Sequence, residues 1–375
     1  METLRKLNDF PESRPSSERR IVVLLSGGVD SSVTAWLLRE EGWSVTALHM
    51  RIPMACGNAL DDRAAVQAAE YLRIPLYQID LTETFHREII ERFQRAYQRA
   101  RTPNPCVDCN ARLKFTHVWD AARRELDIDH LATGHYAITE TDAAGRTLLR
   151  AAESGEKDQS YFVYGIPRER LPFIHFPLGR LPKTATREIA RRAGLPAAEK
   201  ADSMELCFAG GGDYRTALPK DLPCVPGDFV NLQGEKIGTH GGVPNYTVGQ
   251  RKLGVSLGPT PHYVLRIFPQ ENRIVAGSYD EALQTTVTAR LLVVHQPEKL
   301  RPAGELIGKI RSGAHGTPCR VTACDFTPAA AEADEGPFCG NLTVEFSRPV
   351  FAPTPGQHLV VYDDAMAVVA GGVID

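Results

Sequence analysis

A glycine-rich turn carrying hydroxyl and carboxyl groups follows the first strongly apolar run of the chain. The turn reads Ser26-Gly-Gly-Val-Asp-Ser-Ser32, and the run 21–25 before it is rich in β-branched residues, which is typical of a buried parallel strand. Glycines let the backbone approach a ligand, and the amide groups at the start of a helix favour an anion. The turn therefore predicts a phosphate site at the carboxyl end of the first strand. A turn that only joins a strand to a helix is the alternative.

Cysteine side chains offer a second kind of chemistry. The chain has eight cysteines, and Cys106 and Cys109 are followed by Arg112 and Lys114, two cations that would favour a thiolate. Cys207 lies in a loop at an expected domain boundary. Spacing alone cannot pair these thiols, and each is also compatible with a small buried side chain. The C-x-x-C pair could also hold zinc, but a structural zinc site would need a second such pair, which the sequence lacks.

The elements that must position these groups alternate between strand and helix in the first half of the chain. This alternation predicts a doubly wound parallel sheet with right-handed crossovers. The expected strands are 21–25, 44–50, 76–81 and 130–134, the expected helices are 61–72, 83–100, 112–126 and 184–193, and a hairpin is expected within 136–151.

The second half of the chain differs from the first in composition and pattern: it is rich in glycine and proline, and short segments alternate between apolar and polar residues. One short helical piece is expected at 213–218 and an alanine-rich surface loop at 328–336. Regularly spaced short strands predict a small barrel or sandwich. The expected strands are 263–268, 273–278, 287–294, 306–311, 319–326, 341–346, 358–362 and 366–373. We expect a flexible tail at 1–20, a nucleotide domain at 21–210, a connector at 211–283 and a β-barrel-like domain at 284–375.

Composition limits the classes of protein to consider. The 375 residues suggest two or three domains, and 43% hydrophobic with 24% charged residues is ordinary for a globular protein. No apolar run could span a bilayer, and the polar residues 1–20 do not resemble a secretory signal, so we expect a cytoplasmic protein. The net charge of −3 argues against indiscriminate nucleic-acid binding but permits a local basic face. Basic clusters lie at 87–101, 187–192 and 301–320, and each is also typical of a solvated surface.

An ordered set of sequence motifs runs through the chain. The turn at 26–32 lacks the spacing of the usual triphosphate and dinucleotide loops. The motifs that follow it are TPNPCVDCN at 102–110, ATGHY at 132–136, KDQSYF at 157–162, DSMELCF at 202–208, YTVGQRK at 246–252 and TPGQ at 354–357. Together they resemble the tRNA-specific 2-thiouridylase family, within the PP-loop ATP-pyrophosphatase superfamily, and the turn is similar to the PP-loop. The resemblance runs from about residue 21 to the end. It implies an adenine nucleotide alpha hydrolase-like domain, a small connector and a C-terminal β-barrel.

The resemblance also implies roles for individual residues. It makes Cys109 the first catalytic cysteine and Cys207 the one that carries a persulfide. It places around ATP the residues Leu24, Leu25, Ser26, Gly27, Gly28, Val29, Asp30, Ser31, Met50 and Gly134. It places at the target base Asn104, Pro105 and Cys106, and at the rest of the tRNA His135, Lys157, Asp158, Gln159, Arg311, Ser312 and Gln357.

The reaction that the resemblance implies is tRNA-uridine 2-sulfurtransfer. ATP, with Mg²⁺, adenylates O2 of the wobble uridine because a carbonyl oxygen is a poor leaving group. Sulfur reaches Cys207 from a cysteine desulfurase or a relay protein, and the products are 2-thiouridine, AMP and pyrophosphate. Either the persulfide attacks directly and a Cys109–Cys207 disulfide follows, or Cys109 releases hydrogen sulfide. The expected substrates are tRNAs for Glu, Gln and Lys.

Three positions depart from the family pattern. Cys106 stands where many members have an acidic residue, the segment 250–254 is one residue shorter than usual, and Arg311-Ser312 replaces a more usual Arg-Tyr pair. None of these departures removes a catalytic group.

Two other functions fit part of the pattern. Another PP-loop enzyme, either a different tRNA-modifying enzyme or an amide-forming ligase, would keep the turn but would not need Cys109 or Cys207. A non-catalytic RNA-binding protein that senses ATP would bind both ligands and release no AMP.

Overall fold

The computed structural model describes residues 2–11, 19–53, 62–201, 206–209, 213–220, 222, 224–302, 304–333 and 336–375. The chain forms two compact units: residues 1–89 with 106–213, and residues 90–105 with 214–375. The second unit thus takes in residues 90–105, which lie inside the nucleotide domain expected at 21–210. The boundaries of the expected three-part division stay a prediction.

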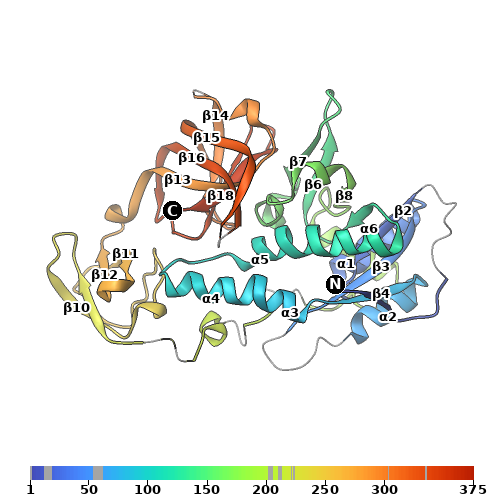
Figure 1. The fold of residues 1–375 in the computed structure, drawn as a ribbon, viewed down its shortest axis with the longest axis horizontal. Coiled ribbons are helices and arrows are strands. Elements are labelled where there is room, and N and C mark those ends of the chain that lie inside the picture. The colour runs from blue at the N-terminus through green and yellow to red at the C-terminus, as the bar shows by residue number, and fades with distance from the viewer. Residues whose placement is uncertain are drawn as a thin grey trace. The chain divides into compact units, whose positions relative to one another are not determined.

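The first unit is built on a six-stranded sheet in the order β1-β4-β3-β2-β5-β8 (Figure 1). Five strands run parallel, which confirms the predicted α/β class. Ile21, Val22 and Val23 of the central strand are fully buried, as expected for a strand covered on both faces. The parallel strands are β2 (Arg20–Leu24), β3 (Ser44–Arg51), β4 (Leu76–Asp80), β5 (His130–Ala132) and β8 (Ile174–His175).

Helices flank these strands, and buried residues of α1, α2 and α8 share one core with the sheet. The helices of the unit with at least eight residues in regular α geometry are α1 (Val29–Glu40), α2 (Arg63–Leu72), α6 (Trp119–Leu126) and α8 (Lys183–Arg192). Shorter or wider helical pieces are α3 (Thr82–Phe85), η1 (His86–Ile90), α5 (Pro105–Asp108), η2 (Cys109–Val118), η3 (Gly155–Lys157), α7 (Ser160–Val163) and η4 (Arg168–Phe173). The predicted hairpin is confirmed as β6 (Ala137–Thr141) with β7 (Thr147–Ala151).

Helical structure around the first cysteine motif begins earlier than the sequence suggested. We expected the helix to begin at residue 112, but α5 already starts at Pro105 and continues into η2. Proline is well suited to the first turn of a helix, where its missing N–H costs nothing. Cys106 and Cys109 therefore lie within helical backbone.

The second unit contains α4 (Glu91–Gln98), a small four-stranded sheet and a closed six-stranded antiparallel barrel (Figure 1). The sheet pairs the predicted hairpin, β11 (Tyr263–Phe268) and β12 (Arg273–Gly277), with β9 (Gly227–Val230) and β10 (Lys236–His240), which the sequence did not reveal. The barrel confirms the predicted C-terminal class. Its strands are β13 (Leu283–Val294), β14 (Glu305–Lys309), β15 (Thr317–Ala333), β16 (Gly336–Phe351), β17 (His358–Tyr362) and β18 (Val368–Ile374).

Two expectations about local structure were wrong. Part of the expected tail forms β1 (Leu4–Lys6), which pairs antiparallel with the edge of the sheet; its charged residues are typical of an edge strand and gave no apolar signal. The expected loop 328–336 is largely strand, because β15 and β16 pair through Ala331 and Phe338, and backbone pairing outweighs the weak strand preference of alanine. The short helical piece expected at 213–218 is confirmed as the 3₁₀ helix η6 (Tyr214–Ala217). Across the described ranges, we find no helix with the length and apolar character needed to cross a membrane.

Candidate nucleotide and thiol sites

The predicted phosphate turn is folded by its own serines. Ser26 donates its backbone N–H to Ser31 Oγ at 3.2 Å, and the two hydroxyl oxygens lie 3.1 Å apart. Ser31 Oγ also donates to the carbonyl of Gly28 at 3.2 Å. Gly27 has φ +71°, and a Cβ there would lie 2.3 Å from the carbonyl carbon of Ala64, so only glycine fits. The serines and the glycine thus have structural reasons to occupy this turn, between β2 and the first turn of α1.

The other predicted nucleotide residues gather at the same edge of the sheet. Gly134 follows β5, which pairs with β2, and a Cβ on Gly134 would lie 2.9 Å from atoms of Asp30 and from the amide nitrogen of Ser31. Met50 is half-buried near the end of β3, on the other side of β2. Leu24 and Leu25 are buried in the core, so only their backbone could reach a nucleotide. Val29 is also buried.

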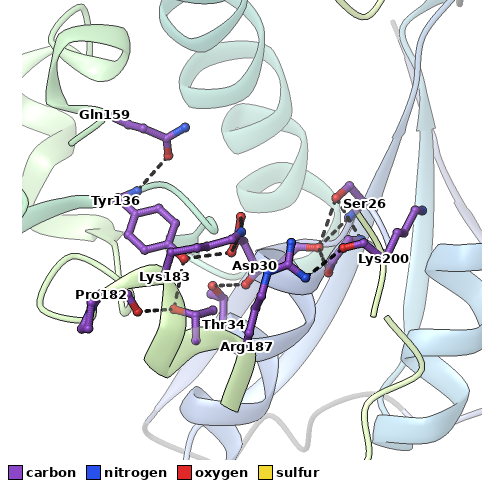
Figure 2. A network of polar contacts seen from close by, with 12 residues as sticks. Ser26, Asp30, Thr34, Tyr136, Gln159, Pro182, Lys183, Arg187 and Lys200 are labelled. Carbon is purple, nitrogen blue, oxygen red and sulfur yellow. Dashed lines mark hydrogen bonds and ion pairs between the residues drawn. The ribbon is translucent and has the colours of Figure 1, made fainter. Parts of the chain in front are cut away.

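Asp30 is the centre of a polar network that joins distant segments (Figure 2). Lys183, the first residue of α8, places its Nζ 2.7 and 2.8 Å from the two carboxylate oxygens of Asp30. The Tyr136 hydroxyl donates to Asp30 Oδ1 at 2.9 Å and lies 3.0 Å from Thr186 Oγ1. Sequence reasoning missed Lys183 and Thr186 as site residues. Lys183 is 153 positions from Asp30, and nothing local marks it beyond its place at the start of a helix.

The thiols of the two cysteine segments lie within electrostatic reach of one another. Burial raises the pKa of Cys109, whereas Lys114 opposes that rise. Loss of solvent around Cys207, followed by the neighbouring Cys109 and Cys106 thiols, raises the pKa of Cys207 to about 12 although part of the residue is exposed. The structure therefore brings together Cys109 and Cys207, which spacing could not pair. All cysteines in the described part of the chain are free thiols.

The expectation that cations favour a thiolate at this helix start was wrong. The pKa of Cys106 is raised as well, because its loss of solvent outweighs the effect of Lys114, and Arg112 is turned to Asp108, 3.4 Å away. Within the ranges that the structure describes, no three or more His, Cys, Asp or Glu side chains are grouped so that they could hold a metal ion.

Packing fixes both cysteine segments. Asn110, buried next to Cys109, donates its side-chain amide to the carbonyl of Phe162 at 2.9 Å. Phe208, next to Cys207, is buried against Phe85, with ring centroids 5.9 Å apart. The preceding residues 202–205 of the predicted DSMELCF motif lie outside the described residues.

Several residues expected to contact tRNA have structural bonds of their own in the first unit. The Asp158 carboxylate accepts hydrogen bonds from the Ala152 amide at 3.1 Å and from the Ser160 amide at 3.0 Å. Gln159 Oε1 accepts from the Tyr136 amide at 2.9 Å, so this segment supports the Tyr136 loop. Lys157, in η3, is half-buried.

His135 lies in the same region and is held neutral. Its Nδ1 lies 2.7 Å from Thr133 Oγ1, and its ring packs against Phe115 and Phe176. Burial and then the Lys114 charge lower the pKa of His135 well below its usual range. A direct tRNA contact by His135 stays a prediction.

In the second unit, a barrel loop holds the segment that precedes the cysteines. Gln357 donates its side-chain amide to the carbonyls of Thr102 at 2.9 Å and Pro103 at 3.4 Å. Gly356 has φ +91°, and a Cβ there would lie 2.8 Å from the Thr102 nitrogen. The barrel therefore shapes the backbone just before Asn104, which is half-buried, and Pro105, which is buried.

The last two residues expected to contact tRNA lie elsewhere in the second unit. Arg311 and Ser312 are exposed, after strand β14 of the barrel. The Arg311 guanidinium donates to the Phe351 carbonyl at 2.5 Å.

Comparison with known proteins assigns a family to this arrangement. Residues 19–211 match the family model described as "tRNA methyl transferase HUP domain", and residues 215–278 match "tRNA methyl transferase PRC-barrel domain". A tRNA-specific 2-thiouridylase MnmA of Roseobacter denitrificans is 35% identical over 98% of this chain and 97% of the relative. Another, of Methylorubrum extorquens, is 38% identical over 98% of this chain and 96% of the relative. The solved structure of the U34-tRNA thiolase NcsA of Methanococcus maripaludis is 17% identical with a TM-score of 0.32, over 52% of this chain and 64% of that one, too distant to support an argument. The full-length identities show that this chain belongs to the tRNA-specific 2-thiouridylase family.

Proposed function

We propose that the protein replaces O2 of the wobble uridine of tRNA with sulfur, consuming ATP and a persulfide. The observation that carries this proposal is that a PP-loop-like turn and the interacting thiols of Cys109 and Cys207 belong to one compact unit. A phosphate-binding turn alone would support many ATP enzymes. The thiol pair is the feature that favours sulfur chemistry.

The first half of the proposed reaction uses the turn at 24–31. The backbone amides at the start of α1 suit the phosphates of ATP, and Met50 and Gly134 border the same edge of the sheet. Attack of uridine O2 on the α-phosphate releases pyrophosphate and converts that oxygen into a good leaving group. The proposed pocket is therefore one in which backbone groups, rather than side-chain cations of the turn, receive the phosphates.

Mg²⁺ was expected to accompany ATP. Asp30 is the only carboxylate in residues 24–31, and both of its oxygens are bonded to Lys183. The described turn therefore offers the ion no carboxylate in this conformation.

The second half of the proposed reaction uses the cysteines. A persulfide on Cys207 supplies the sulfur. Either its terminal sulfur attacks C2, AMP leaves, and Cys109 then cleaves the sulfur–sulfur bond of the adduct, or Cys109 first attacks the persulfide and frees hydrogen sulfide, which attacks C2 as AMP leaves. In both routes the two thiols supply the electrons and end as a Cys109–Cys207 disulfide. Because burial raises the pKa of Cys109, its thiol is protonated at neutral pH. Lys114 is the cation placed to favour the thiolate when that proton leaves.

The tRNA and the sulfur donor complete the proposal. The uridine must leave the anticodon stack, and Asn104, Pro105 and Cys106 are the residues proposed to meet it. We further propose tRNAs for Glu, Gln and Lys as substrates, a cysteine desulfurase or relay protein as donor, and the cytoplasm as the compartment. The proposed parts are a nucleotide domain at 21–210, a connector at 211–283 and a tRNA-binding barrel at 284–375.

The direct test is nucleoside mass analysis of tRNA incubated with the protein, ATP, Mg²⁺ and a persulfide source. Wild type is compared with Cys109→Ser, Cys207→Ser and the control Cys224→Ser, which removes an exposed thiol of the second unit. We expect uridine 34 to gain sulfur in place of oxygen with wild type and Cys224→Ser alone. Thiolation that survives both other substitutions, or an added methyl group instead of sulfur, would contradict the proposal.

A further inference from the structure

Lys183 forms a close ion pair with both oxygens of Asp30, the only carboxylate of the phosphate turn. Its Nζ lies 2.7 and 2.8 Å from Asp30 Oδ1 and Oδ2. The two side chains are 14% and 33% exposed, respectively, so water screens the pair only in part. Figure 2 shows Lys183 reaching Asp30 from α8, beside Tyr136.

The surroundings of Asp30 hold it in one place. The Tyr136 hydroxyl donates to Oδ1, and Tyr136 itself is 2% exposed. Thr34 donates its hydroxyl to the Asp30 carbonyl at 2.8 Å. Thr186, fully buried on α8, lies 3.0 Å from the Tyr136 hydroxyl and so ties that contact to the helix that carries Lys183.

The charge of Asp30 conflicts with the proposed ligand. Asp30 stands in the first turn of α1, where the turn amides would receive phosphate. An uncompensated carboxylate there would repel a polyphosphate, and the low dielectric of a partly buried site would strengthen that repulsion. A fixed cation on the same carboxylate removes this conflict.

We propose that Lys183 is a positioning residue that neutralises Asp30 and holds it in place so that the turn can accept the phosphates of ATP. This inference rests on the proposed function, because it requires ATP to bind at residues 24–31. It assigns to α8 a part in nucleotide binding, through Asp30 rather than through the reacting atoms.

The test is ATP affinity, measured by isothermal titration calorimetry on the full chain without tRNA. Lys183→Met should weaken ATP binding by at least roughly tenfold, as expected when a partly buried charge loses its partner. Lys183→Arg keeps the charge and should stay within about threefold of wild type. The matched control is Arg192→Met, which removes a positive charge from an exposed position in the last turn of the same helix and should leave ATP affinity unchanged.

A double variant distinguishes two roles of Lys183: neutralising the charge of Asp30, or only supporting the fold. Adding Asp30→Asn to Lys183→Met removes the uncompensated charge, so ATP affinity should recover to within about threefold of wild type. Thermal unfolding reports whether each variant is folded, and the double variant decides the question if Lys183→Met alone does not fold. Wild-type affinity in Lys183→Met, or a double variant that is folded and still weak, would overturn the inference. Failure of wild type to bind ATP would instead refute the proposed function.

Discussion

Gly134→Ala tests whether the end of β5 supports the phosphate turn. The φ of Gly134 lies outside the left-handed region, so alanine strains no backbone there. Its Cβ would lie 2.9 Å from the carbonyl carbon and Cβ of Asp30 and from the Ser31 nitrogen. Carbon atoms pack at about 3.5 Å or more, so the turn must shift by roughly half an ångström. Because two of the three atoms are backbone atoms, no side-chain rotation can relieve the contact.

The expected cost has a stability part and a catalytic part. Overpacking of this kind costs about 1–3 kcal/mol, which lowers Tm by roughly 2–4 °C per kcal/mol in a unit of this size. A misplaced turn should slow AMP formation by about tenfold or more, because an error of about 1 Å can cost a hundredfold.

The assay follows AMP and pyrophosphate release with saturating tRNA, together with ATP affinity and thermal unfolding. Gly155→Ala is the matched control, because a Cβ there meets no atom within 4 Å, and it should change none of these measurements. A Gly134→Ala protein with wild-type ATP affinity and AMP release would refute the reasoning that this glycine backs the turn.

Three further predictions concern other parts of the chain. Gln357→Leu removes two hydrogen bonds to the 102–103 backbone, each contributing about 0.5–1.5 kcal/mol. Steady-state kinetics should then show a higher KM for tRNA and an unchanged ATP affinity. The control Gln284→Leu, at an exposed position on the barrel, should change neither the KM nor the ATP affinity. His358 is buried, and burial lowers its pKa to about 3. As the pH falls, the imidazole is therefore protonated in the unfolded chain before it is protonated in the folded one. The stability that comes from the neutral His358 is present above about pH 6.5 and is lost as the pH falls toward about 3, at up to about 1.4 kcal/mol per pH unit. Urea unfolding across that range should show a shallower acid loss for His358→Leu than for wild type, and equal slopes would contradict this assignment. Because the pKa of Cys207 is about 12, its alkylation at neutral pH should be slow for a thiol with an exposed surface. Lys114→Met should slow this alkylation further, since Lys114 lowers the pKa of Cys207. Iodoacetamide labelling mapped by mass spectrometry measures the rate; fast labelling, or labelling unaffected by the substitution, would contradict the raised pKa and the effect of Lys114.

Local patterns in the sequence predicted the parts of the site that depend on neighbouring residues. The run at 21–25 and the turn that follows it lie within a dozen positions, so strand, turn and helix could be read together. The barrel strands were predicted for the same reason, because each alternates within a few residues. By contrast, β9 and β10 are short and include glycine, and their pairing with a distant hairpin is what makes them strands.

Tertiary contacts decided what the sequence could not predict. The Lys183–Asp30 pair joins residues 153 positions apart, and no local spacing encodes it. The thiolate prediction for Cys106 and Cys109 took account of nearby cations but not of burial, which in the fold outweighs Lys114. Gln357 was expected to contact tRNA, yet its amide holds the 102–103 backbone, a role visible only once the barrel is closed.

The central claim is that the ATP chemistry of the turn and the sulfur chemistry of the cysteines form one reaction. The most direct measurement is a single turnover of protein preloaded with persulfide, in which AMP and thionucleoside are quantified from the same sample. We predict equal amounts of the two products with wild type, and no thionucleoside from Cys207→Ser taken through the same loading procedure. AMP released from wild type without sulfur entering the tRNA would contradict the account.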